Sequence, residues 1–165
     1  MKKSKLNLLL LIIPAIISYL FEKEILLKED VTIDWLNKCL ESFKKANLDY
    51  LIIYFSGHGG SIRHKDFIEL NKDGERIKFT KLEKIATRQL NIYDCCRASV
   101  DDDFSKNMII FSCIYESLDE QINIRKNYEK RILQTKPQQM SLYSCSEEEC
   151  SQDTGEDGLY TFNFL

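Results

Sequence analysis

Two short strings in this chain hold side chains that could do covalent chemistry. The segment 56–60, SGHGG, contributes the imidazole of His58, and the segment 94–97, DCCR, contributes the adjacent thiols of Cys95 and Cys96. Each string follows directly on an apolar run. A cysteine thiol and a histidine that are held together form a nucleophile and its general base. The chain could therefore attack a carbonyl carbon through sulfur, provided that its fold brings the two strings together.

The apolar runs before these strings are predicted to be neighbouring strands of one sheet. Leu51–Phe55 is apolar without alternation, as expected of a strand covered on both faces, and Leu90–Tyr93 is a second, shorter strand. Ligands of open α/β sheets bind beyond the carboxyl ends of the strands. If the two strands are parallel neighbours, His58 and Cys96 face one crevice. A histidine in a glycine-rich turn is by itself more often structural, so the pairing with the thiol carries this prediction.

Other segments predict the remaining elements of an α/β fold around a mostly parallel sheet. Apolar residues at three- and four-residue spacing predict an amphipathic helix over Val31–Asn47, with Thr32 as its N-cap. Further predicted elements are a hairpin over Phe67–Phe79 with its turn at 71–74, a brief helix from Thr80 to Arg88 that a capping box opens, a helix over Ser117–Gln134 and a third strand over Gln139–Cys145.

Bulk composition limits the class of protein. The 165 residues suffice for one domain with a core, and 44% hydrophobic with 30% charged residues is typical of an ordinary folded protein. A net charge of −3 gives no reason to expect nucleic acid or an anionic membrane as a partner. The six cysteines include no C-x-x-C pair and are not grouped with the two histidines, so we expect no metal site. Free thiols and a reducing, cytoplasmic location fit this pattern best.

The N-terminal segment 1–23 allows two interpretations. Lysines at 2, 3 and 5 precede the apolar stretch Leu6–Leu20, which matches the basic and apolar regions of a secretory signal. Alternatively, Leu8–Ile13 is a buried first strand, since a continuous apolar run of this length fits the core of a parallel sheet. The stretch is shorter than the ~20 residues of a membrane-spanning helix, so a membrane anchor is not expected. The sequence leaves the choice between signal and strand open.

Residues 24–165 resemble the catalytic domain of the caspase, metacaspase and paracaspase group of cysteine peptidases. The matching strings are YFSGHG at 54–59, IYDCCRA at 92–98 and, more loosely, LYSCS at 142–146. The resemblance implies a three-layer α/β sandwich, a Cys–His dyad and a protein or peptide substrate. It also selects Cys96 as the nucleophile, because the caspase signature places the reactive cysteine directly before arginine. Cys95 then fills a small-residue position and is expected to be buried and unreactive.

The resemblance also implies roles for the neighbouring residues. His58 would assist attack by Cys96 and protonate the leaving amine, while the backbone amides of Gly59 and Cys96 stabilise the oxyanion. Metacaspases and paracaspases have aspartate at the position of Asp94, at the base of the S1 pocket, and cleave after arginine or lysine. A carboxylate there attracts a cationic side chain and pairs with a guanidinium. The alternative is that Asp94 merely caps the turn that follows it.

Two weaker features have simpler explanations. Many metacaspases need calcium, and its oxygen ligands could come from Asp73 and Glu75 together with the acidic run 101–103. A solvated acidic loop is the simpler interpretation, and we expect no obligatory cofactor. Basic residues within 125–136 could be self-cleavage sites that match the pocket, but such residues more often mark the wet face of a helix.

Departures from the family pattern keep other functions open. His58 and Cys96 are 38 positions apart, against about 50 in caspases. The first strand and helix of the family are missing or compressed into residues 6–21, and the chain stops where a further helix and strand normally begin. We therefore expect a scaffold that is incomplete at both ends. The alternatives to an active peptidase are an inactive caspase-like protein that binds partners as a decoy, and a redox or metal-binding thiol protein. The oligomeric state is not indicated.

Overall fold

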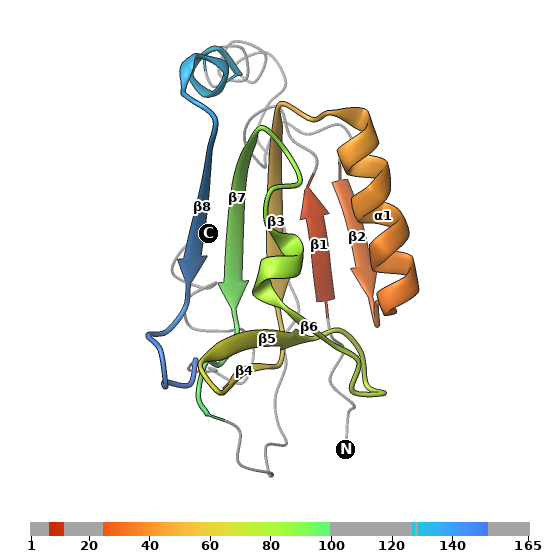
Figure 1. Ribbon diagram of the computed structural model, residues 1–165, viewed down its shortest axis with the longest axis vertical. Helices are drawn as coiled ribbons and strands as arrows, with labels where there is room; N and C mark the ends of the chain where they lie inside the picture. Colours follow the sequence, from red (N-terminus) through yellow and green to blue (C-terminus); the bar gives the residue numbers. More distant parts are fainter. Residues whose placement is uncertain (1–6, 12–24, 100–126, 128, 152–165) are drawn as a thin grey trace, which may run out of the picture.

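The computed structural model describes residues 7–11, 25–99, 127 and 129–151 (Figure 1). A five-stranded sheet has the order β2-β1-β3-β7-β8, and a three-stranded sheet has the order β4-β5-β6. One long helix, α1 (Ile33–Ala46), and the short 3-10 helix η3 (Phe79–Leu82) accompany them. The strands are β1 (Asn7–Leu11), β2 (Ile25–Glu29), β3 (Tyr50–Ser56), β4 (Gly59–Ile62), β5 (Lys65–Glu69), β6 (Arg76–Lys78), β7 (Arg88–Asp94) and β8 (Gln138–Tyr143).

The larger sheet is mostly parallel in strand direction, as the sequence predicts. β3, β7 and β8 are paired in parallel, and β1 is antiparallel to both of its neighbours, β2 and β3. Within this sheet β1 therefore runs against the other strands, as the arrows of Figure 1 show. Residues 8–11 of the first strand that one interpretation placed at Leu8–Ile13 belong to β1, in the interior of the sheet, and residues 12–13 lie outside the described residues.

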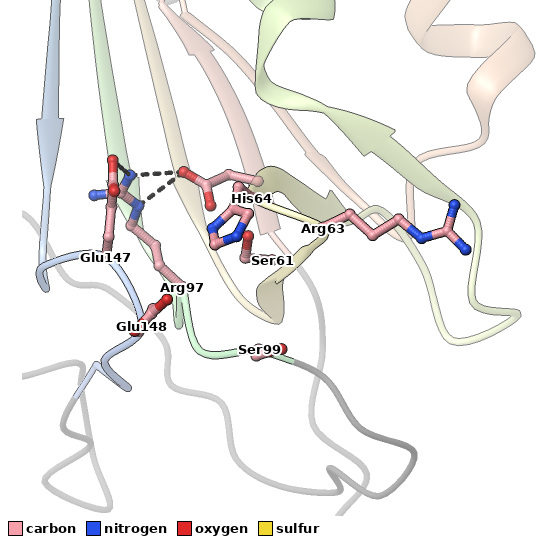
Figure 2. A pocket seen from close by; sticks show the side chains of 8 residues that line it. Ser61, Arg63, His64, Arg97, Ser99, Glu147 and Glu148 are labelled. Carbon is pink, nitrogen blue, oxygen red and sulfur yellow. Dashed lines mark hydrogen bonds and ion pairs between the residues drawn. The ribbon is translucent and has the colours of Figure 1, made fainter.

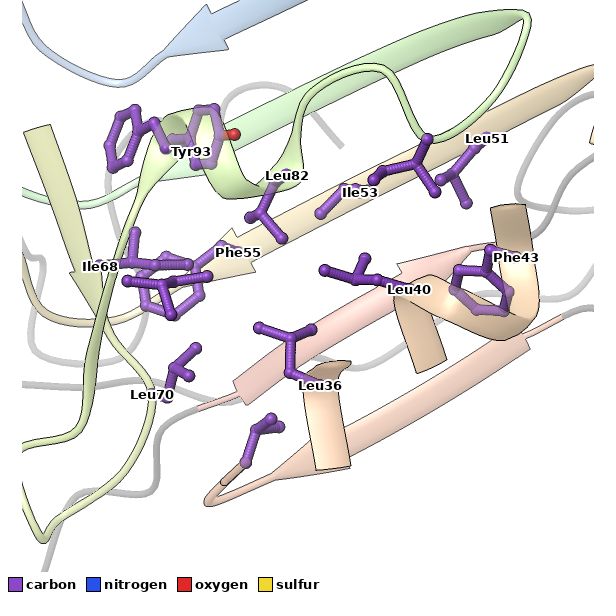
Figure 3. Close-up of a cluster of buried hydrophobic side chains, with 14 of the residues drawn as sticks. Leu36, Leu40, Phe43, Leu51, Ile53, Phe55, Ile68, Leu70, Leu82 and Tyr93 are labelled. Atoms are coloured by element: carbon purple, nitrogen blue, oxygen red, sulfur yellow. The ribbon is translucent and has the colours of Figure 1, made fainter. Parts of the chain in front are cut away.

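Helix α1 forms where the amphipathic pattern predicts it. The Thr32 Oγ1 atom accepts a hydrogen bond of 3.3 Å from the backbone N–H of Trp35, which satisfies a donor of the first turn. Asn47 ends the helix in the left-handed conformation. Figure 3 shows that one stripe of the helix faces β3 in a single buried cluster, formed by Leu36, Leu40 and Phe43 on the helix and Leu51, Ile53 and Phe55 on the strand.

The opposite face of the sheet is also apolar. Ile52 and Ile92 are buried there, with Tyr54 and Leu142 packed against them. Because successive strand residues point to opposite faces, β3 is buried on both, as its unbroken apolar run predicts. The helix predicted over 117–134 is helical at 127 and 129–134, and the rest of it lies outside the described residues.

The predicted hairpin over 67–79 is confirmed as β5 and β6, but the strand β4, which pairs with the other edge of β5, was not expected. Residues 59–62 begin with two glycines, which are typical of a turn, yet they form β4 and pair antiparallel with β5. Glycine weakens a strand only modestly, and here the register with β5 decides the conformation. The carboxyl side of His58 is therefore held in a sheet rather than in an open loop.

The predicted helix from Thr80 to Arg88 is wrong. Only η3 forms there, and the chain then straightens into β7 at Arg88. The buried side-chain amide of Gln89 supplies the hydrogen bonds that a helix would have made. Its Oε1 accepts from the backbone N–H groups of Ile85 (2.8 Å) and Ala86 (3.3 Å), and its Nε2 donates to the carbonyl of Leu82. A side chain that satisfies the backbone removes the need for a helical turn.

Candidate active site

The two strings that carry the imidazole and the thiol end on one edge of the sheet. β3 and β7 are adjacent and parallel, and their last paired residues are Ser56 and Asp94. The backbone N–H of Gly57 donates to the carbonyl of Asp94 at 3.2 Å, so the two chains stay together past the strand ends. His58 and Cys96 each lie two residues beyond this pair, and both are half-buried. The condition under which the two strings share one edge, that their strands are parallel neighbours, is thus met.

Close backbone approach fixes the geometry between the strings. A Cβ atom on Gly59 would lie 2.7 Å from the Cys95 Sγ atom and 2.8 Å from the carbonyl oxygen of Cys96. A side chain at position 59 is therefore excluded without movement of the thiol-bearing segment. The carbonyl of His58 also accepts a 2.8 Å hydrogen bond from the backbone N–H of Glu69 in β5. The histidine is thereby anchored between the small sheet and residues 95–96.

The two adjacent thiols have different environments. Cys95 is 2% exposed within the apolar core, and burial raises its pKa well above the usual value. Cys96 is half-buried and lies at the sheet edge. Since a buried structural thiol is inert and an accessible one can react, the environments favour Cys96 as the thiol available for chemistry.

The pKa of Cys96 is raised to about 11 in this conformation. Burial is the largest cause, and a hydrogen bond with the Cys150 side chain is the next. A backbone hydrogen bond from Ser151 acts in the opposite direction and lowers the pKa. Among the described residues, no hydrogen bond joins the Cys96 thiol to the His58 ring. The raised pKa favours the protonated form of the thiol at neutral pH.

Asp94 is a buried carboxylate, 4% exposed, two residues before Cys96. Its Oδ1 atom accepts a 2.9 Å hydrogen bond from the Ser151 hydroxyl. This contact spans 57 positions of the chain, and nothing in the local sequence around residue 151 signals it. Ser151 is thus a residue of the site that sequence analysis missed.

The segment 144–151 after β8 covers this edge of the sheet. The backbone N–H of Arg97 donates to the carbonyl of Glu149 at 2.9 Å, and the N–H of Glu148 donates to the carbonyl of Arg97 at 3.3 Å. The Ser144 N–H donates to the carbonyl of Tyr93 at 3.0 Å. These bonds place the segment across residues 93–97, which brings Cys150 and Ser151 to the thiol and the carboxylate.

Arg97 ties three parts of the chain together directly after Cys96. Its Nε and Nη2 atoms donate to Oδ2 of Asp66 in β5 at 2.9 and 2.7 Å, and Nη2 also lies 3.2 Å from Oε1 of Glu147. The guanidinium stacks over the ring of Tyr143, 4.3 Å from its centroid. Such planar, charge-assisted contacts are the strong ones for arginine. Sequence analysis used Arg97 only to locate the nucleophile and missed its role in holding the loop.

A pocket of about 110 Å³ lies beside Arg97, lined by the β4–β5 turn and by the chain after β7 and β8 (Figure 2). In the turn, Arg63 and His64 both have positive φ, as the two central residues of a tight hairpin require. Figure 2 shows the Arg63 side chain pointing away from the group around Arg97. Arg97, the last residue of the DCCR string, lines this pocket, whereas His58 and Cys96 do not.

The described residues carry only part of the predicted calcium ligands. The Glu75 carboxylate accepts from the Asn71 side-chain amide at 2.5 Å and from the Ile33 N–H at 3.4 Å, so it is already used within the fold. The acidic run 101–103 lies outside the described residues. In the part of the chain that the structure covers, no group of three or more candidate ligands forms a metal site. A calcium site stays a prediction.

The described part of the chain also contains no helix long and apolar enough to cross a membrane. Its cysteines, five in number, are all free thiols.

A comparison with protein-family models matches residues 16–165 to the caspase domain. The match includes both strings, the sheet edge that joins them and the segment after β8. A comparison with curated proteins gives no match.

Proposed function

The chain belongs to the caspase-domain family of cysteine peptidases, and from that premise we propose that it is an endopeptidase that cleaves after arginine or lysine through Cys96 and His58. The observation that carries the proposal is the parallel register of β3 and β7. Because Ser56 pairs with Asp94, the imidazole and the thiol stand at equal positions beyond adjacent strands.

The reaction would begin with transfer of the Cys96 proton to His58. The thiolate then attacks the carbonyl carbon of the substrate, and the imidazolium protonates the leaving amine, which leaves an acyl-enzyme thioester for water to hydrolyse. The backbone amides of Gly59 and Cys96 would donate to the oxyanion. The tight approach of Gly59 to the Cys96 carbonyl supports this pairing, because it holds the two backbones together.

The need for a base follows from the environment of Cys96. With its pKa raised to about 11, the thiol has little thiolate at neutral pH while Cys150 lies against it. The proposed base is His58, which is half-buried, is anchored through its carbonyl to β5 and lies at the same edge of the sheet. Movement of the segment 144–151 away from the thiol would remove the Cys150 hydrogen bond and lower the pKa.

Asp94 supports a preference for basic substrates. A carboxylate buried at the strand end attracts a cationic side chain more strongly than one in water would. The Ser151 hydroxyl occupies one of the several acceptor positions of this carboxylate. Arginine, which pairs through two parallel bonds, should bind better than lysine.

An inactive, partner-binding caspase-like protein is the second candidate. Two observations favour it, the short spacing between His58 and Cys96 and the contacts of Cys150 and Ser151 with the thiol and the carboxylate. In that case the edge of the sheet would bind peptides without cleaving them.

Hydrolysis of fluorogenic peptides tests the proposal. The full chain is assayed, with and without calcium, on matched peptides that end in arginine, lysine or aspartate before the reporter. We expect release from the arginine and lysine peptides only, and its loss in Cys96→Ala and His58→Ala. Cys39→Ala, which removes a thiol from α1, is the matched control and should keep full activity. Equal activity of Cys96→Ala, or binding of the peptides without any cleavage by the wild type, would overturn it.

A further inference from the structure

Cys150 is held over Cys96 by bonds on both sides of it. On one side, the Glu149 carbonyl accepts from the Arg97 N–H at 2.9 Å. On the other side, the Ser151 hydroxyl donates to the Asp94 carboxylate at 2.9 Å. Residues 149 and 151 are therefore fixed to residues 97 and 94, and the backbone of Cys150 runs beside the residues between them. The Cys150 side chain is close enough to Cys96 to contribute to the raised pKa of that thiol.

The other thiols of this region have different partners. The Cys145 thiol lies 3.3 Å from the carbonyl oxygen of Cys95 and 3.3 Å from that of Glu149. Cys95 is enclosed in the core, where solutes do not reach it. Cys150 is exposed, so an oxidant in solution has access to one member of the pair in contact.

We propose that Cys96 and Cys150 are a site of reversible oxidation, at which peroxide closes a disulfide that takes the nucleophile out of use. In the first step the Cys150 sulfur displaces water from hydrogen peroxide and becomes a sulfenic acid. In the second step the Cys96 sulfur attacks that sulfur, the S–S bond forms and a second water leaves. The two sulfurs together lose two electrons to the peroxide, and their two protons leave in the waters. A dithiol reverses the reaction by exchange.

The inhibitory consequence rests on the proposed function, whereas the disulfide itself does not. A closed Cys96–Cys150 bond removes the sulfur that would attack the substrate. It also holds Ser151 on Asp94, so that the thiol and the proposed S1 carboxylate would be blocked together. Reduction would restore both.

Disulfide mapping of the full chain tests the site without any need for activity. Reduced protein is exposed to hydrogen peroxide, its remaining thiols are blocked with N-ethylmaleimide, and its peptides are analysed by mass spectrometry without reduction. We expect a linked peptide pair that joins Cys96 to Cys150, lost on treatment with dithiothreitol. Cys150→Ser should remove it, and Cys145→Ser, the matched control in the same segment, should retain it. Thermal unfolding of both variants checks that they are folded.

The proposal would be overturned if Cys96 formed its disulfide chiefly with another cysteine. It would also be overturned if Cys96 formed no disulfide and were oxidised further instead. A second measurement, labelling of Cys96 by an arginyl peptide electrophile, separates the two proposals. We expect peroxide to abolish labelling of the wild type and dithiothreitol to restore it, whereas Cys150→Ser, which lacks the sulfur that peroxide oxidises, should keep its labelling. If the Cys96–Cys150 disulfide forms but the electrophile never labels the reduced protein, the oxidation site is supported and the peptidase proposal is refuted. Labelling of the wild type that survives peroxide refutes the oxidation site alone.

Discussion

Replacing Gly59 with alanine would push a methyl group into the two residues that carry the thiols. The new Cβ would lie 2.7 Å from the Cys95 Sγ atom and 2.8 Å from the Cys96 carbonyl oxygen. Ordinary contact begins near 3.4 Å, so the Cys96 backbone must move by about 0.6 Å or the strand β4 must yield. Overpacking of this kind costs about 1–3 kcal/mol of folding free energy.

The effect on chemistry should exceed the effect on stability. A misplacement of about 1 Å between reacting groups costs roughly 100-fold in rate, so a shift of about 0.6 Å should cost at least about 10-fold. The assay is the rate at which an arginyl peptide electrophile labels Cys96, measured together with the free energy of unfolding in urea. Gly59→Ala should lose labelling while most molecules remain folded.

Gly74→Ala provides the matched control. Gly74 has φ +78°, and a Cβ atom added there would meet no heavy atom within 4 Å, so alanine at this position is strained without a clash. The left-handed conformation costs alanine about 1–2 kcal/mol, similar to the cost expected at position 59. We expect Gly74→Ala to destabilise the protein and to label at the wild-type rate. A folded Gly59→Ala that labels as fast as Gly74→Ala would refute the role of backbone approach at the site.

Three further predictions concern the contacts of Asp94, Cys96 and Arg97. Asp94→Asn should slow labelling by an arginyl electrophile at least about 10-fold while leaving labelling by small iodoacetamide unchanged, because only the charged probe needs the carboxylate. The rate at which iodoacetamide modifies Cys96 should rise with pH, with a midpoint of about 11, because burial and the interaction with Cys150 favour the protonated thiol and raise its pKa. Cys150→Ser should move this midpoint to lower pH. Arg97→Met should lower the free energy of unfolding in urea by about 3 kcal/mol, because it leaves a mostly buried carboxylate unpaired. Glu147→Gln, at a side chain 82% exposed, should cost less than about 1 kcal/mol.

The elements that carry the two strings could be predicted because their signals are local. The unbroken apolar run of β3 indicates a strand buried on both faces, and the helical spacing of α1 indicates a helix buried on one face. The N-cap Thr32 marks where the helix begins. The fold class favours a parallel arrangement of β3 and β7, and the structure supplies their register. His58 and Cys96 are placed at one edge of the sheet on that basis alone.

The misses come from long-range contacts. The strand β4 could not be predicted because its glycines carry a turn signal, and only its pairing with β5 overrides that signal. The helix over 80–88 does not form because Gln89, from the next strand, satisfies the backbone groups of residues 82–86. The contacts of Cys150 and Ser151 join residues more than fifty positions apart, and no periodicity or spacing encodes them.

The central claim is that Cys96 is the nucleophile and His58 its base. It is tested most directly by identifying the residue that an arginyl peptide electrophile modifies in the reduced full chain. Digestion and mass spectrometry should find the adduct on Cys96, with attachment lost in Cys96→Ala and strongly slowed in His58→Ala. An adduct on Cys150 or Cys39, or labelling of Cys96 at an unchanged rate without His58, would contradict the claim.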